Sequence, residues 1–124
     1  MEIKDKSVKE LETLSQEIRD RIIDVVSRKG GHFSSTLGAV ELTLGMHYVF
    51  DAYCDPFIFD VSHQCYPHKL LTGRWEEFET VRQFGGLSGF TKPNESKADY
   101  FVAGHSSTSI SLAVGAAKAI ALKK

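Results

Sequence analysis

The sequence predicts an α/β fold, with part of a parallel sheet and helices flanking it, and three observations support that class. Apolar residues recur at helical spacing in several long segments. Two short apolar runs, 57–61 and 100–102, lie between helical segments and predict buried strands. Helices that alternate with buried strands are typical of parallel sheets. Because a sheet usually has about five strands, we expect the sheet to be incomplete in this chain.

The first helix is predicted over residues 8–28. Its apolar residues have the three-and-four spacing of an amphipathic helix: Val8, Leu11, Leu14, Ile18, Ile22, Val25 and Val26. Ser7 and Glu10 have the spacing of a capping box at its start. Gly30 and Gly31 are expected to end it.

Four further segments complete the predicted organisation. Residues 38–50 predict a second helix, apolar on most faces and therefore buried. Residues 64–71 predict a brief helix, since its proline can occupy a first turn. Residues 82–97 contain several glycines and a proline and predict a long loop. An alanine-rich helix is predicted over 106–122.

The composition limits the kinds of partner that the protein can have. A chain of 124 residues, 42% hydrophobic and 25% charged with net charge −1, suits one domain or part of one. That charge balance gives no basis for a nucleic-acid or membrane-surface partner. No apolar run approaches the roughly 20 residues of a membrane span, and the polar start is unlike a secretory signal. We expect a cytoplasmic protein whose cysteines, Cys54 and Cys65, are reduced.

The segment Gly104-His105-Ser106-Ser107 is the first of three that could carry chemistry. It follows a predicted strand and opens a predicted helix. The free N–H groups of a helix start, together with hydroxyl side chains, favour an anion such as a diphosphate. A plain Ser/Thr N-cap without a ligand is the alternative interpretation.

The other two segments each contain a histidine. Asp60-Val61-Ser62-His63-Gln64 lies where a predicted strand ends, which is where open α/β sheets bind ligands. His63 could hydrogen-bond a substrate or move a proton near neutral pH, or it could cap a local turn. Gly30-Gly31-His32 lies between two predicted helices, where its glycines permit a sharp reversal. A helix stop followed by an N-cap is the competing interpretation there.

Three other features are interpreted as structural. His68 follows His63 by five residues, but no third or fourth ligand has suitable spacing, so no metal site is predicted. His47 lies in the predicted buried helix and is interpreted as a structural histidine. Nothing in the sequence marks Cys65 as an acidified, nucleophilic thiol.

Taken together and in this order, the three segments resemble the family of 1-deoxy-D-xylulose-5-phosphate synthases. The resemblance covers nearly everything after the first helix. The matching stretches are Gly-Gly-His-Phe at 30–33, Leu-Gly-Ala-Val-Glu-Leu-Thr at 37–43, His-Tyr-Val-Phe at 47–50, Asp-Val-Ser-His-Gln at 60–64, His-Lys-Leu-Leu-Thr-Gly-Arg at 68–74 and Gly-His-Ser-Ser-Thr-Ser-Ile-Ser at 104–111. The family usually has Gly where Ser62 stands, so a positive φ there would strain the backbone.

The resemblance implies a transketolase-like transferase that depends on thiamine diphosphate and Mg²⁺. Residues 1–124 would be the N-terminal part of its diphosphate-binding, parallel-sheet domain, with later domains absent. The implied reaction joins pyruvate to glyceraldehyde 3-phosphate and releases carbon dioxide. Its product feeds non-mevalonate isoprenoid synthesis and the synthesis of thiamine and pyridoxal. The full-length protein is expected to be a homodimer.

The resemblance also assigns site residues by position. His63 and Gly104-His105-Ser106 look like the family's thiamine-diphosphate contacts, and Ser35 looks like a neighbour of the cofactor. His32 looks like the substrate-side histidine. His32 and His63 are therefore the candidate catalytic residues, which would hydrogen-bond the reacting oxygens and move protons.

The family's Mg²⁺ ligands and its cofactor-activating glutamate are expected beyond Lys124. Because a metal supplies much of the charge that holds a diphosphate, we expect these 124 residues to be inactive alone. The few strands also predict exposed apolar surface, and hence self-association or a missing partner segment. The alternatives are another transketolase-type enzyme and a natural, non-catalytic truncated binding fragment.

Overall fold

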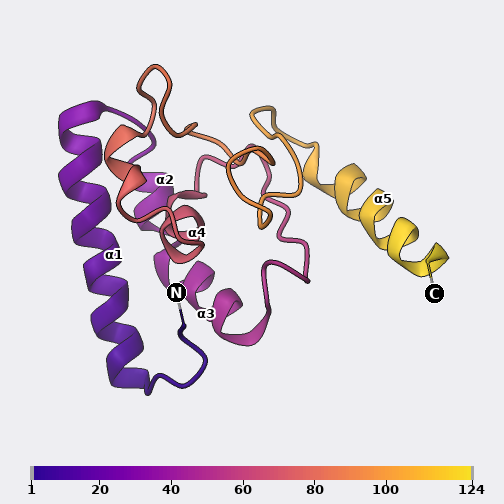
Figure 1. Ribbon diagram of the computed structural model, residues 1–124, viewed down its shortest axis with the longest axis horizontal. Coiled ribbons are helices and arrows are strands. Elements are labelled where there is room, and N and C mark those ends of the chain that lie inside the picture. Colours follow the sequence, from indigo (N-terminus) through magenta and orange to yellow (C-terminus); the bar gives the residue numbers. More distant parts are fainter. Residues whose placement is uncertain (1, 124) are drawn as a thin grey trace.

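The structure, a computed structural model, describes residues 2–123, and the regular elements in that range are helical. They are α1 (Val8–Lys29), α2 (Ser34–Leu37), α3 (Val40–Val49), α4 (Tyr66–Leu71), the 3-10 helix η1 (Glu77–Thr80) and α5 (Ser109–Leu122). Figure 1 shows α1 along one side of the body, with α2, α3 and α4 beside it and α5 projecting from the opposite side. None of the helices between residues 2 and 123 combines the length and the apolar character needed to cross a membrane.

Helix α1 forms as predicted because both of its ends are specified locally. The Ser7 hydroxyl accepts a hydrogen bond from the Glu10 amide at 3.4 Å, and the Ser7 amide donates to the Glu10 carboxylate at 2.8 Å. Gly30 ends the helix at φ 79°, a backbone that suits glycine. The predicted apolar stripe is buried at Leu14, Ile18, Ile22, Val25 and Val26. The predicted capping box and amphipathic helix are both confirmed.

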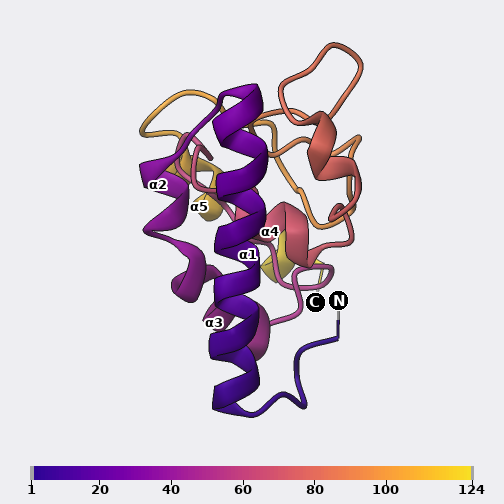
Figure 2. The ribbon, with the colours of Figure 1, turned by 90° about the vertical axis from the view of Figure 1, so that its left-hand side faces the viewer.

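The main core lies where α1, α3 and α4 pack against one another, and Figure 2 shows α1 lengthwise in front of the other helices. Tyr66 and Leu70 from α4 are fully buried against Ile18 and Ile22 of α1. The Tyr66 ring meets the Phe78 ring edge to face, with centroids 5.2 Å apart. Burial of these apolar side chains is the main favourable contribution to folding of this part of the chain.

The predicted helix over 38–50 differs from the structure in two respects. It corresponds to α3 alone, which begins at Val40, while the short helix α2 forms before it, in residues that were not predicted to be helical. It is also buried on one side only, since Leu42, Val49 and Phe50 are exposed. The inner face of α3 packs on α1 and α4, and among residues 2–123 no element covers its outer face.

The predicted parallel sheet is absent from residues 2–123, so that prediction is corrected. Residues 57–61 and 100–102 form no strand. Phe57 is nevertheless buried, with its ring 4.9 Å from the His47 ring, whereas Val102 is exposed. Burial is thus predicted correctly only for part of the first run, and a strand exists only through hydrogen bonds to a neighbouring strand, which the described residues do not provide.

Helix α5 carries apolar side chains that nothing in residues 2–123 buries. No residue of this helix is buried, and Ile110, Val114 and Leu122 are largely exposed. Its start is also later than the predicted residue 106. The expectation of exposed apolar surface is confirmed here, whereas self-association stays a prediction.

The predicted loop over 82–97 is confirmed, and it is folded around buried charges. The Asp99 carboxylate, 2% exposed, accepts four hydrogen bonds. Two come from the Arg74 guanidinium, each at 2.8 Å, one from the Lys92 amide at 2.8 Å and one from His68 Nε2 at 3.1 Å. Burial raises the pKa of Asp99, but the donors His68 and Arg74 outweigh it and hold the pKa well below its usual range. Asp99 is therefore ionised.

Glu95 makes a second set of bonds from the same loop. Its carboxylate accepts hydrogen bonds from the Ser88 amide at 2.7 Å, from Arg74 at 3.3 Å and from the buried Lys69 ammonium. Lys69 and Arg74 belong to α4 and the turn after it. The loop is thus fixed to the core by paired charges, which is how buried charges are normally tolerated.

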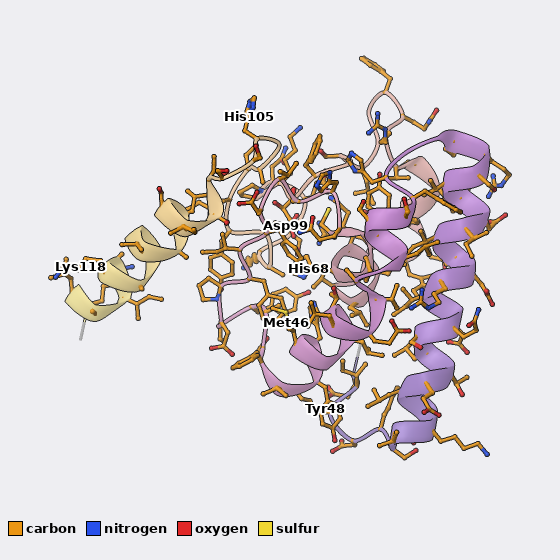
Figure 3. All side chains as sticks on the ribbon, turned by 180° about the vertical axis from the view of Figure 1, so that it is seen from behind. Met46, Tyr48, His68, Asp99, His105 and Lys118 are labelled. Carbon is orange, nitrogen blue, oxygen red and sulfur yellow. The ribbon has the colours of Figure 1, made fainter. Side chains whose placement is uncertain are left out.

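A pair of buried histidines extends this network into α3. His47 Nε2 lies 2.9 Å from His68 Nδ1. Since ionised Asp99 can only accept, His68 Nε2 carries a proton, and a neutral His68 then accepts from His47 through Nδ1. Burial lowers the pKa of His68 and lowers that of His47 to about 3. Both rings are therefore neutral near pH 7. Figure 3 shows His68 and Asp99 inside the molecule, while His105 and Lys118 lie at its outer edge.

The buried Asp99 is expected to be a large contributor to stability. Asp99→Asn leaves the buried Arg74 charge without its main counter-charge, so we expect the free energy of unfolding to fall by about 3–5 kcal/mol. Urea titration followed by circular dichroism measures this. Asp24→Asn is the matched control, because Asp24 pairs with Arg28 at the surface, where ion pairs contribute about 0–1 kcal/mol. Equal losses in the two variants would contradict the assignment.

The neutral histidine pair predicts a loss of stability in acid. Each histidine of the unfolded chain takes up a proton as the pH falls below about 6.5, whereas His47 in the folded protein does so only near pH 3. The free energy of unfolding should therefore fall between pH 6.5 and 4.5, by up to about 1.4 kcal/mol per pH unit for each histidine. In His47→Gln the slope should be shallower, because glutamine keeps a donor and gains no proton. His105→Gln is the control, and an unchanged slope in His47→Gln would refute the prediction.

Candidate functional site

The turn at residues 60–63 has an unusual backbone. Val61 and Ser62 have φ values of 56° and 67°, in the left-handed region that favours glycine. Each such residue costs on the order of 1–3 kcal/mol and persists only where its surroundings hold it. The Ser62 amide donates to the Asp60 carbonyl at 2.5 Å, and the buried Ser62 hydroxyl accepts from the Thr91 amide at 3.1 Å. The positive φ considered for Ser62 is thus confirmed, and its hydroxyl has a use there that glycine lacks.

His63 is held through its backbone by α2. Its carbonyl accepts hydrogen bonds from the Thr36 hydroxyl at 2.8 Å and from the Ser35 hydroxyl at 3.5 Å. Ser35 therefore lies beside His63. Because the His63 carbonyl is bonded and Ser62 is held by Thr91, the backbone of His63 is fixed from both sides.

The His32 and His63 side chains lie against each other. Their ring centroids are 5.3 Å apart and nearly perpendicular, at 86°. His32 also contacts the rings of Phe90 and Tyr66, with centroids 5.1 and 5.9 Å away. Gly31, at φ 143°, permits this approach, since a Cβ there would lie 2.7 Å from the Tyr66 hydroxyl. The structure thus brings together the two histidines that the sequence singled out.

His32 has the properties of a proton acceptor. Burial, followed by the positive charge of Arg82, lowers its pKa below the ordinary histidine value, so the ring is neutral near pH 7. Among residues 2–123, its buried Nδ1 has no hydrogen-bond partner.

Arg82 is a residue of this site that sequence reasoning missed. Its side chain passes close to Gly31 and Gly89, at 3.3 and 3.2 Å from where their Cβ atoms would be. Its backbone is left-handed, at φ 60°, and its amide donates to the Leu87 carbonyl at 2.7 Å. The glycines that leave room for Arg82 were visible in the sequence, but nothing indicated which side chain they accommodate.

The segment that begins at Gly104 is hydrogen-bonded to the turn at residues 60–63 through the Asp60 carboxylate. The Ser107 amide donates to Asp60 Oδ1 at 3.0 Å, and the Ser109 hydroxyl donates to Asp60 Oδ2 at 2.7 Å. Gly104, at φ 154°, has open space where a Cβ would lie, and His105 and Ser106 are exposed. His105 is not one of the rings packed around His32.

Residues 2–123 contain neither a metal-binding cluster nor a reactive thiol, the two other kinds of site considered from the sequence. Within residues 2–123 no three or more His, Cys, Asp or Glu side chains converge to hold a metal ion. His47 and His68 bond each other and Asp99 instead. Burial raises the pKa of Cys65 to about 12, and its thiol lies 3.7 Å from the Gly89 carbonyl, so this cysteine is a structural thiol.

The chain was compared with known proteins, and the relatives that it matches are synthases. Over residues 1–124 the chain matches the family described as 1-deoxy-D-xylulose-5-phosphate synthase, and it belongs to that family.

Three relatives show how much of such a protein the chain represents. Proteins named 1-deoxy-D-xylulose-5-phosphate synthase are 89% identical over 124 residues in Aliarcobacter butzleri, 74% over 123 in a Nitratiruptor species and 74% over 122 in Wolinella succinogenes. The matches cover 100%, 99% and 98% of this chain, but 21%, 20% and 20% of the relatives. The chain thus spans about a fifth of the length of the curated relatives that it matches.

The strained turn gives a prediction for Ser62. Ser62→Ala keeps the left-handed backbone and leaves the Thr91 amide unpaired, so we expect about 1–3 kcal/mol of destabilisation. Ser62→Gly leaves the same amide unpaired but relieves the backbone, so it should be more stable than Ser62→Ala by about 1 kcal/mol. Chemical denaturation of the two variants measures the difference. If the alanine variant is as stable as the glycine variant, the turn is not strained at this residue.

Proposed function

We propose that this chain supplies one wall of the active site of a 1-deoxy-D-xylulose-5-phosphate synthase. The proposed enzyme is a transketolase-like, thiamine-diphosphate-dependent transferase that joins pyruvate to glyceraldehyde 3-phosphate with loss of carbon dioxide. The observation that carries the proposal is the 89% identity, over the whole chain, to a protein with that name. The His32–His63 pair beside the Asp60-linked segment supports it from geometry.

The residues present fit an anionic cofactor such as thiamine diphosphate. The hydroxyl of the exposed Ser106 and the backbone N–H groups of residues 104–106 are donors available to a diphosphate, whereas the Ser107 amide is bonded to Asp60. Arg82 adds a positive charge near His32. We assign Gly104, His105, Ser106 and His63 to the cofactor, with Ser35 as a neighbour. When bound, thiamine diphosphate supplies the electron sink for decarboxylation. The ligands of Mg²⁺ are expected beyond Lys124.

His32 and His63 take the catalytic roles in this proposal. Neutral His32 can accept a proton or a hydrogen bond from a reacting hydroxyl through a ring nitrogen. His63, whose position is fixed through its own carbonyl and through Ser62, lies at van der Waals range from His32. Two imidazoles at this spacing can each hydrogen-bond a different oxygen of one substrate. Phe90 and Tyr66 shield one side of His32 from water.

The remaining expectations about the complete protein belong to the same proposal. Residues 1–124 are taken as the N-terminal part of a parallel-sheet, diphosphate-binding domain, and they are expected to be inactive alone. The exposed apolar residues of α5 are consistent with a surface that the rest of such a domain covers. The homodimer, the cytoplasmic location and the supply of isoprenoid, thiamine and pyridoxal synthesis stay predictions. Sequencing beyond codon 124 distinguishes this proposal from a natural, non-catalytic truncation.

The proposal predicts the kinetics of histidine variants. In the complete protein that carries this chain, His32→Ala and His63→Ala should each lower turnover of pyruvate and glyceraldehyde 3-phosphate by about 10²–10⁴-fold, the usual contribution of a general acid or base. Tyr48→Phe, on the outer part of α3, is the control and should leave turnover unchanged.

Two results would count against the proposal. Wild-type turnover in both histidine variants would remove them from the mechanism. A complete protein that uses ketose phosphates as donors instead of pyruvate would be a different transketolase-type enzyme.

A further inference from the structure

The segment 104–109 depends on one side chain for its hydrogen bonds to the body. Its helix, α5, buries no residue, and Thr108, the residue before that helix, uses its hydroxyl on the His105 carbonyl, 3.1 Å away, rather than as a cap. The two hydrogen bonds described between this segment and distant parts of the chain both end on Asp60. They span 47 and 49 residues of sequence.

Asp60 also belongs to the turn that carries His63. The Asp60 carbonyl accepts from the Ser62 amide at 2.5 Å, and Ser62 is held in turn by the Thr91 amide. The position of the Asp60 carboxylate is therefore tied to the same strained backbone that directs His63. The turn at residues 60–63 therefore contacts two parts of the candidate site. His63 packs against His32, and Asp60 bonds Ser107 and Ser109.

The charge of Asp60 suits this place. Hydrogen bonds from the Ser109 hydroxyl and the Ser107 amide lower its pKa, so the side chain is ionised near pH 7. A carboxylate at the start of a helix is favoured by the free N–H groups and by the helix dipole. Asp60 bonds Ser107 and Ser109, while Gly104 and Ser106, in the irregular residues before α5, have open space or are exposed.

We propose that Asp60 is a positioning residue, which holds the segment 104–109 at a fixed distance from His63 so that Gly104 and Ser106 face the diphosphate. This inference rests on the proposed function for the identity of the ligand. Asp60 acts through Ser107 and Ser109 and does not touch the cofactor. Asp60 contributes by keeping the segment 104–109 ordered before the cofactor binds.

The test uses the complete protein and three variants. Asp60→Ala removes both bonds and should raise the dissociation constant of thiamine diphosphate, measured by calorimetry with Mg²⁺, by about tenfold or more. Asp60→Asn can still pair with Ser107 and Ser109 through its amide and should recover part of that loss. Ser109→Ala removes one bond and should give a smaller rise.

Amide hydrogen exchange without cofactor separates positioning from a general structural role. In Asp60→Ala, exchange should accelerate in residues 104–112 and stay unchanged in the α1–α4 core. Asp5→Asn, which changes an exposed carboxylate before α1, is the charge-matched control and should alter neither readout.

The outcomes separate this inference from the proposed function. Binding in Asp60→Ala as tight as wild type, or tighter, overturns the inference; tighter binding would show that the carboxylate competes with the diphosphate. Unchanged exchange at 104–112 overturns it as well, even where binding weakens. If the wild-type complete protein does not bind thiamine diphosphate, the proposed function fails, and the exchange experiment still decides whether Asp60 holds the segment.

Discussion

Asp99 accepts hydrogen bonds from Arg74, His68 and the Lys92 amide, and the irregular half of this chain is arranged around that carboxylate. Residues 81–108 contain no helix or strand, so no repeating backbone pattern determines their path. Paired charges do so instead, and because an unpaired charge in the core is costly, few other loop conformations can satisfy them. The loop is therefore fixed without being regular.

The loop that contains Thr91 and Phe90 helps to fix the geometry of the candidate site. Thr91 lies eight residues before Asp99 and supplies the amide that holds the Ser62 hydroxyl, and Phe90 packs on His32. His63 is thus oriented by a residue whose own place is set by a buried ion pair some distance away. His32 and His63 form no described hydrogen bond with Asp99 or Arg74, so a change in the core can alter the site without touching either histidine.

Features that depend on residues close in sequence could be predicted, whereas contacts between residues far apart in sequence were missed. Ser7 and Glu10 lie three residues apart, so the cap of α1 could be predicted from sequence. The positive φ at Ser62 was considered only because the family that the chain resembles usually has Gly there. The pairing of Asp99 with Arg74 spans 25 residues and leaves no periodic trace. The sheet was predicted from apolar runs that are indeed buried at Phe57, but strand formation depends on neighbours that residues 2–123 do not provide. Burial was predicted correctly for the inner side of α1 and for Phe57, but not for the outer side of α3 or for Val102. The pairing of distant residues could not be predicted.

Helix α5 shows how the affinity of this site depends on more than its contacts. A helix of 14 residues without tertiary packing is only marginally stable in water. Where its apolar sides are uncovered, part of the free energy of any binding event at Gly104 and Ser106 goes into ordering the helix behind them. Where they are covered, that conformational entropy has been lost already during folding. The same donors, at the same distances, then bind the same anion more tightly.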